Sequence, residues 1–410
     1  MKLSHSQQMS SSYFTALLIG AWLLGLAGES LYAPAMPKMV AQLSTSSALI
    51  KQTITFFILG KSLSMIICSP IAEAFGRRQF ILFGLSLFVI GGLGCVFSQN
   101  INMLLISRLL QGLGCSITVL MGRAIVNDLF ESRRAAKVFS YIFMGNAISI
   151  FALPAIGGYL VVYFDWRAIF LILTIYGTII FSLVWWLLPQ TNQIISLNSL
   201  KPKVILSNYK TVVSNAHFWG FLLCVAFMMA GEKAYTTTSA FLFINTVGLS
   251  AITYGYLTSA MWGAHLIGAF FAGWLAVRSG IDRVIIVGMA MVALPGLIML
   301  IMVLGHWDNI DIFTIMMFIY MAGSGFIVVS AAVGIVRPFP NLIGFATAFA
   351  MALEFVIATI MSYVISQSSS ASVFPVETIV GIMGVLVFCA WLFFLKFPRA
   401  AALQGSLGGL

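Results

Sequence analysis

The chain of 410 residues is 61% hydrophobic and only 8% charged, with a mean hydropathy of +1.05. Soluble globular proteins carry about 25% charged residues, so this composition excludes a water-soluble enzyme. The net charge of +10 would suggest a nucleic-acid partner in a soluble protein. In a chain this apolar, its meaning depends on where the 21 Lys and Arg residues fall.

Twelve apolar runs follow one another along the chain. A helix needs about 20 apolar residues to cross a bilayer core of about 30 Å, and each run approaches or exceeds that length. The first run is too long for the apolar region of a secretory signal, so we expect it to be the first crossing. The predicted crossings are 13–34, 49–72, 79–98, 102–126, 136–162, 167–188, 217–243, 254–276, 284–304, 312–334, 342–366 and 375–396.

The cations are distributed unevenly among the segments between these runs. With a cytoplasmic N-terminus, the inside segments hold 14 Lys and Arg residues, whereas the outside loops hold only Lys38, Lys51 and Arg167. Cytoplasmic loops of membrane proteins carry the excess of Lys and Arg. The positive charge therefore predicts that both termini are cytoplasmic, and it argues against a nucleic-acid partner.

An internal repeat divides the chain near its middle. Residues 27–32 (A-G-E-S-L-Y) resemble residues 230–235 (A-G-E-K-A-Y), and a polar interval lies between the sixth and seventh runs. We predict an all-α integral membrane protein with twelve transmembrane helices in two pseudo-symmetric six-helix bundles, with a substrate site near the bilayer midplane where the bundles meet. The predicted parts are an N-terminal bundle at 1–189, a cytoplasmic linker at 190–216 and a C-terminal bundle at 217–410.

Several short motifs resemble those of one transporter family. Residues 69–78 read S-P-I-A-E-A-F-G-R-R, similar to the G-x-x-x-D-R-x-G-R-R signature of the major facilitator superfamily, with substitutions at the first Gly, the Asp and the first Arg. Residues 108–112 read R-L-L-Q-G, like the family's R-x-x-Q-G. Residues 153–158 read L-P-A-I-G-G, similar to the G-P-x-x-G-G motif of drug/proton antiporters but with Leu for the first Gly.

Together these motifs resemble the twelve-helix drug/proton antiporters of the bicyclomycin and chloramphenicol resistance type. The resemblance implies a monomeric transporter of the bacterial inner membrane, whose partners are a small-molecule substrate, protons and the lipid bilayer. Neither a Walker-type loop nor a G-x-S-x-G or H-E-x-x-H motif occurs, so we expect no enzyme activity, no cofactor and no metal site. The five cysteines lie in apolar runs and are interpreted as small core residues.

Ionisable residues inside the predicted crossings are the candidates for proton coupling and substrate contact. A charge at the bilayer centre costs about 2.5–3.5 kcal/mol even on the mildest scales, so such residues usually serve a function or have a partner. Glu29 ranks first because the related antiporters carry an acid in this region, although the family's position corresponds to Ser30. Permanent ion pairing is the alternative. The six candidates are Glu29, Lys61, Arg108, Glu232, Lys233 and Glu354.

The resemblance also implies two groups of conformational residues. In the first, a cytoplasmic latch, Arg77 would pair with Asp128, and Glu73 would face the positive end of the eleventh helix. The second is the antiporter-like motif, which would control which way the cavity opens. Solvated loop charges and simple helix packing are the respective alternatives. The latch residues are Glu73, Gly76, Arg77, Arg78, Arg123 and Asp128, and those of the motif are Pro154, Gly157 and Gly158.

Four residues are candidates for the wall of a substrate cavity by helix position alone: Tyr32, Tyr235, Trp262 and His265. Packing or a place in the interfacial aromatic belt is the alternative for each.

The sequence predicts a proton-coupled exporter of small, mostly lipophilic compounds. A second hypothesis keeps the fold but makes the substrate an anionic metabolite such as a carboxylate siderophore. The membrane bases slightly outnumber the acids in this count, with Lys61, Arg108, Arg123 and Lys233 against Glu29, Glu232 and Glu354. A third is a membrane sensor that binds a ligand without transporting it. Comparing lipophilic cations with polycarboxylates separates the first two, and ligand binding without flux would indicate the third.

Overall fold

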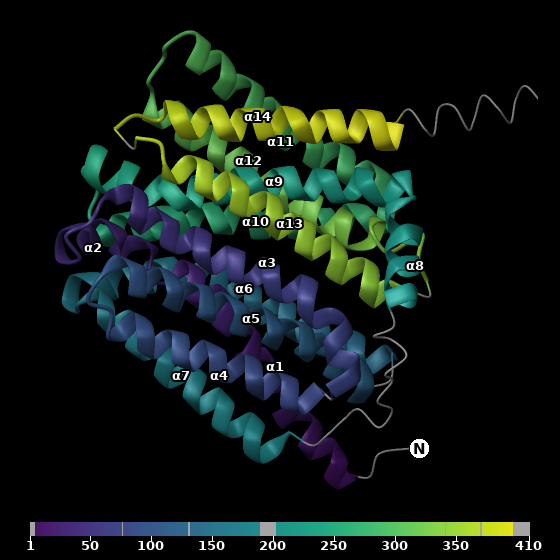
Figure 1. The fold of residues 1–410 in the computed structure, drawn as a ribbon. Coiled ribbons are helices and arrows are strands. Elements are labelled where there is room, and N and C mark those ends of the chain that lie inside the picture. Colours follow the sequence, from purple (N-terminus) through teal and green to yellow (C-terminus); the bar gives the residue numbers. More distant parts are fainter. Residues whose placement is uncertain are drawn as a thin grey trace, which may run out of the picture. The chain divides into compact units, whose positions relative to one another are not determined.

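The computed structural model describes residues 5–75, 77–129, 132–188, 202–340, 342–369 and 371–396; within them, the side chains at 5–15, 66–75, 123–124, 127–129, 132–136, 143 and 202–205 are not described. Every regular element in these ranges is a helix (Figure 1). The chain forms two compact units. Unit 1 comprises Met1–Val204 and Leu249–Ser259, and unit 2 comprises Ile205–Gly248 and Ala260–Leu410.

Unit 1 contains the first six predicted crossings. Its first crossing continues into two short helices, each of which has a proline in its first turn, where the missing backbone N–H costs nothing. The elements of unit 1 are α1 (His5–Ser30), η1 (Ala33–Ala35), α2 (Met36–Gln42), α3 (Ser47–Phe75), α4 (Arg77–Val96), α5 (Ile101–Leu129), α6 (Ser132–Tyr163) and α7 (Trp166–Leu187).

Unit 2 contains the remaining crossings, except that the beginnings of α8 and α10 cluster with unit 1. Its elements are α8 (Pro202–Val213), α9 (Ala216–Ala240), η3 (Phe241–Thr246), α10 (Ala251–Ser279), α11 (Ile281–Leu304), α12 (Ile310–Gly334), α13 (Ile343–Ser366), α14 (Phe374–Trp391) and η4 (Leu392–Lys396).

The helices are long and apolar enough for a multi-pass membrane protein. Within the described residues, ten candidate spans pass on length and hydropathy, and α8 followed by α9 and η3 makes an eleventh if this pair, bent by 83°, is one span. The remaining predicted crossing, 49–72, forms α3, which is not among these spans and whose side chains at 66–75 are not described. The predicted all-α membrane fold is confirmed.

The two units repeat the same helix pairings. In unit 1, α1 packs on α6 and α7, and α4 packs on α5 and α7. In unit 2, the corresponding helix α9 packs on α13 and α14, and α11 packs on α12 and α14. The first spanning helix of each unit thus packs on the fifth and sixth, and the third packs on the fourth and sixth. Two pseudo-symmetric six-helix bundles require such matching contacts.

Glycines mark equivalent close crossings in the two units. A Cβ atom on Gly112 of α5 would overlap the carbonyl oxygen of Phe57 in α3. In unit 2, a Cβ on Gly325 of α12 would overlap the carbonyl oxygen of His265 in α10. Small residues allow membrane helices to approach this closely. The same device therefore holds the second helix against the fourth in each half.

Two features differ from the sequence interpretation. Lys51, which was counted with the outer loops, lies in the first turns of α3 and has no exposed surface. The predicted linker contains the helix α8, in which Val212 is fully buried while Leu206 is 70% exposed. The polar composition of the linker as a whole had hidden this short two-sided helix.

The N-terminus of α7 provides a test of local stability. Asp165 caps this helix, because its carboxylate oxygen accepts a hydrogen bond from the backbone N–H of Arg167 at 2.9 Å. We expect Asp165→Ala to lower the free energy of unfolding by about 1 kcal/mol. Asp165→Asn keeps a hydrogen-bond acceptor, so it should lower the free energy of unfolding by only a few tenths of a kcal/mol. Thermal unfolding in detergent would measure both, and equal losses would contradict the capping role.

Candidate functional site

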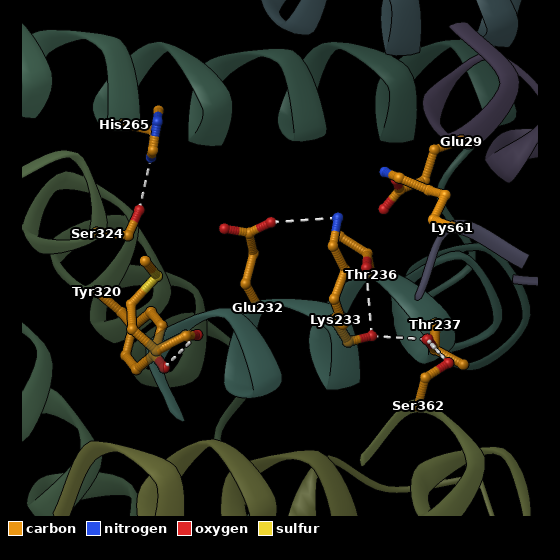
Figure 2. A network of polar contacts seen from close by, with 11 residues as sticks. Glu29, Lys61, Glu232, Lys233, Thr236, Thr237, His265, Tyr320, Ser324 and Ser362 are labelled. Carbon is orange, nitrogen blue, oxygen red and sulfur yellow. Dashed lines mark hydrogen bonds and ion pairs between the residues drawn. The ribbon is translucent and has the colours of Figure 1, made fainter. Parts of the chain in front are cut away.

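The first predicted coupling acid lies in an ion pair. Glu29 of α1 and Lys61 of α3 place Oε2 and Nζ 3.2 Å apart, and their side chains are only 10% and 13% exposed (Figure 2). A carboxylate and an ammonium ion in contact reduce each other's cost among apolar helices. Glu29 is therefore held by a base that the sequence had placed midway along another helix.

Arg108 of α5 is surrounded by aromatic rings. Its guanidinium carbon lies 4.3 Å from the ring centre of Tyr32, 4.2 Å from that of Phe57 and 5.6 Å from that of Phe170. Arg108 has no exposed surface. A desolvated cation on an aromatic face gains about 2 kcal/mol or more. We call these three rings the aromatic cage.

Neutral oxygens complete the surroundings of Arg108. Its Nε donates to the carbonyl oxygen of Thr53 at 3.4 Å, and Nη1 donates to Oε1 of Gln111 at 2.9 Å. The hydroxyl of Tyr32 is 2.9 Å from that of Thr53. In the described part of the chain, Arg108 Nη2 and Gln111 Nε2 are buried without a hydrogen-bond partner. The site thus offers two unused donors beside a fixed positive charge.

Unit 2 holds a second acid–base pair. Oε1 of Glu232 and Nζ of Lys233 are 3.4 Å apart, and the two side chains are 6% and 7% exposed (Figure 2). Adjacent residues do not normally face each other on a helix, so both side chains must bend toward one another. The pair agrees with ion pairing, the alternative to a functional role that the sequence left open for these residues.

Hydroxyl groups surround the backbone of this pair. The carbonyl oxygen of Lys233 accepts hydrogen bonds from Thr237 at 2.6 Å and from Thr236 at 3.2 Å. The hydroxyl of Thr237 also lies 2.9 Å from that of Ser362 in α13 (Figure 2). Both threonine hydroxyls thus bond back to their own helix, and that of Thr237 also ties α9 to α13.

Three of the cavity candidates lie around α10. His265 Nδ1 is 2.6 Å from the hydroxyl of Ser324 in α12, and the ring of Trp262 lies 5.6 Å from that of His265. The hydroxyl of Tyr235 donates to Sδ of Met261 at 2.8 Å. The fourth candidate, Tyr32, belongs to the aromatic cage in unit 1. Tyr32 and Tyr235 have no exposed surface, and a place in the wall of a substrate cavity stays a prediction for all four candidates.

Glu354 lies in the middle of α13 and is 9% exposed. Its side chain therefore faces the protein interior rather than lipid. Nothing in the geometry of the described residues assigns it a role in coupling.

The antiporter-like motif lies where helices approach closely. A Cβ on Gly157 of α6 would overlap the carbonyl oxygen of Leu31, and one on Gly158 would lie 2.6 Å from that of Ala251. A Cβ on Gly255 would in turn lie 2.6 Å from the carbonyl oxygen of Pro154. The glycines thus allow the helices to pack closely at these points, and a gating role for the motif stays a prediction.

Most of the predicted latch lies outside the described side chains. This holds for Glu73, Gly76, Arg123 and Asp128, so the expected pair of Arg77 with Asp128 stays a prediction. Arg78 is described, and its Nη2 donates to the carbonyl oxygen of Trp185 at 2.5 Å. This contact ties the start of α4 to the end of α7.

Sequence reasoning missed Glu377. It lies in the first turn of α14, has no exposed surface, and neither of its carboxylate oxygens has a hydrogen-bond partner among the described residues. Gly381 and Gly384, which follow it at helical spacing, face α11. In the sequence, an acid on the same helix face as two glycines could have indicated that Glu377 is buried between helices.

Known proteins agree with this architecture. The family model described as Major Facilitator Superfamily matches residues 17–362. Multidrug resistance protein D of Escherichia coli is 26% identical over 90% of this chain and 92% of its own. The bicyclomycin resistance protein homolog of Haemophilus influenzae is 22% identical over 95% of this chain and 97% of its own.

A solved structure shares the fold at low sequence identity. A crystal structure of the D-xylose-proton symporter aligns with a TM-score of 0.72 and 16% identity, covering 94% of this chain and 97% of the other. The family that the motifs predicted is confirmed by the model that matches most of the chain. The chain belongs to the Major Facilitator Superfamily and is a multi-pass membrane protein.

Proposed function

We propose that the protein is a proton-coupled exporter of small, mostly lipophilic compounds. The observation that carries the proposal is the Glu29–Lys61 ion pair, which places a titratable carboxylate among membrane helices of a Major Facilitator Superfamily chain. Relatives named for multidrug and bicyclomycin resistance support the substrate class.

The chemistry of such a pair supports competition between proton and substrate. A lipophilic cation arriving at Glu29 would replace Lys61 as its partner, whereas a proton on Glu29 would remove the charge that holds the cation. Loading from the cytoplasm and protonation from outside would then make export depend on the proton gradient. The resemblance to drug/proton antiporters implies that the arginine of R-x-x-Q-G tunes a nearby proton site, and Arg108 would have this role here.

The proposed arrangement is a monomer in the bacterial inner membrane with both termini in the cytoplasm, as the distribution of Lys and Arg favours. The bundles at 1–189 and 217–410 would rock about the site, joined by the linker at 190–216. The latch residues and the motif around Pro154 would favour one orientation over the other. This alternation would expose the substrate site to one side at a time.

Glu29→Gln is the direct test. In inverted vesicles we expect proton-driven uptake of a lipophilic cation to fall to the level of vesicles without the transporter, because the amide cannot exchange a proton. For the purified wild type, affinity for the cation should fall as the pH is lowered, because protons compete for the carboxylate. In Glu29→Gln the affinity should not vary with pH.

Asp311→Asn is the matched control, since it makes the same acid-to-amide change at an exposed position in the first turn of α12. It should leave uptake and its pH dependence unchanged. Undiminished proton-driven uptake in Glu29→Gln would remove Glu29 as the coupling acid.

Export or import of an anionic metabolite is the second candidate. The buried donors of Arg108 and Gln111 that lack a partner among the described residues favour it, because a carboxylate is the acceptor that such donors prefer. A transport panel comparing tetraphenylphosphonium and ethidium with citrate and other polycarboxylates would separate the two functions. Transport of the polycarboxylates alone would replace the first proposal with the second.

A further inference from the structure

The helix α8 carries an exposed surface that the proposed function does not use. Its buried side is fixed by Tyr209, whose ring lies 4.7 Å from that of Phe345 and 4.9 Å from that of Phe349 in α13. Val212 on the same side has no exposed surface. These contacts set the rotation of α8 about its own axis.

The direction of α8 relative to the membrane follows from α9. The two helices meet at an angle of 83° (Figure 1). Spanning helices tilt on average about 20° from the bilayer normal, so α8 runs close to the membrane plane. Because it packs on the first turns of α13 and precedes α9 directly, it lies at the membrane face where both helices begin.

The residues around α8 change in a regular order. At about 100° per residue, Val213 and Leu206 follow the buried side, then Lys210, then Ser207 and Thr211. Leu206 is 70% exposed and Val213 is 41% exposed. Going around the helix, the side that contacts the protein is therefore followed by apolar, then cationic, then hydroxyl side chains. A helix that lies at a bilayer surface needs this order, because its successive faces contact hydrocarbon, headgroups and water.

A positive charge and a tryptophan beside α8 favour an anionic phospholipid as the ligand. Trp219, at the start of α9, donates from Nε1 to the carbonyl oxygen of Val213 at 2.7 Å, and tryptophan is enriched at membrane interfaces. The sequence contains no Asp or Glu from Trp166 to Gly231. Lys210 is exposed and forms no ion pair with the described residues. Its ammonium group therefore suits the phosphate of an anionic phospholipid.

We propose that α8 is an interfacial helix that inserts Leu206 and Val213 into the bilayer surface and binds an anionic phospholipid headgroup through Lys210. Attraction to anionic lipid contributes about 1 kcal/mol per surface lysine, which corresponds to roughly a fivefold change in lipid affinity. The site depends on unit 2 alone, so it stands whether or not the proposed substrate class is correct.

Spin labels test the placement of the helix. The full-length protein, with its native cysteines replaced by serine, would carry Leu206→Cys or Thr211→Cys in vesicles of phosphatidylglycerol and phosphatidylcholine. We expect the label at 206 to be accessible to oxygen and protected from a water-soluble nickel reagent, and the label at 211 to show the reverse. Equal exposure of both labels to the nickel reagent would overturn the interfacial placement.

Lipid retention tests the headgroup. We expect Lys210→Gln to weaken retention of phosphatidylglycerol by the purified transporter about fivefold while leaving that of phosphatidylcholine unchanged. Lys137→Gln is the matched control, because the ammonium group of Lys137 in α6 already lies 5.9 Å from the ring centre of Tyr141; this change should alter neither retention. Unchanged phosphatidylglycerol retention in Lys210→Gln would overturn the assignment of the anionic lipid to Lys210.

Discussion

Gly112→Ala is expected to disrupt the folding of unit 1. The added Cβ would overlap the carbonyl oxygen and carbon of Phe57 and lie 3.2 Å from the Cα of Gly60. These are backbone atoms, so no rotamer change can relieve the overlap and α3 must move away from α5. We expect a loss of about 3 kcal/mol or more in the free energy of unfolding, at the upper end for overpacking.

A separation of α3 from α5 would also displace the buried charged side chains on these helices. Lys61 directly follows Gly60 on α3, and Arg108 lies one turn before Gly112 on α5. We therefore expect Gly112→Ala to lose transport along with stability. Thermal unfolding of the purified protein in detergent, followed by size-exclusion chromatography, would measure the loss.

Gly273→Ala is the control for this change. Gly273 lies inside α10, and a Cβ there would meet no atom within 4 Å. Alanine is favoured over glycine in a helix by about 1 kcal/mol, so this variant should be as stable as the wild type or more so. A wild-type melting temperature for Gly112→Ala would show that the crossing of α3 and α5 is looser than the structure indicates.

The sequence predicted the helices because their signal is local. Runs of about 20 apolar residues need no knowledge of their neighbours, and each predicted crossing has a helix in the structure. The helix α8 was missed because a short amphipathic segment inside a polar interval gives a weak signal. Lys51 was counted with the outer loop although the predicted crossing 49–72 includes it, because it lies only two residues after the start of that run.

The partners of the site residues could not be predicted in the same way. Arg108 was found through its motif, yet its aromatic cage comes from α1, α3 and α7. Pairing was foreseen as an alternative for Glu29, but nothing in the sequence selects Lys61 over Arg108 as its partner. Such pairings depend on the rotation and depth of separate helices, which packing decides.

Arg108→Ala is expected to have the second large effect. The change removes a buried cation from three aromatic faces and two hydrogen bonds, and it leaves a cavity among Tyr32, Phe57 and Phe170. A desolvated cation–π contact contributes about 2 kcal/mol or more, and a hydrogen bond to a charged group about 1.5–3 kcal/mol. We expect the free energy of unfolding to fall by about 4 kcal/mol, measured by thermal unfolding in detergent.

Two further variants separate the charge of Arg108 from its shape. Arg108→Lys keeps the charge but loses the planar group that stacks on the rings, so it should recover only part of the stability. Arg278→Ala removes a cation that lies 4.0 Å from the ring centre of Trp274 at an exposed site, where the contribution is about 0.5–1 kcal/mol. If Arg278→Ala cost as much as Arg108→Ala, burial would not be what strengthens the aromatic cage. If Arg108→Lys matched the wild type in stability but not in transport, the guanidinium group would be needed for its unused donors rather than for packing.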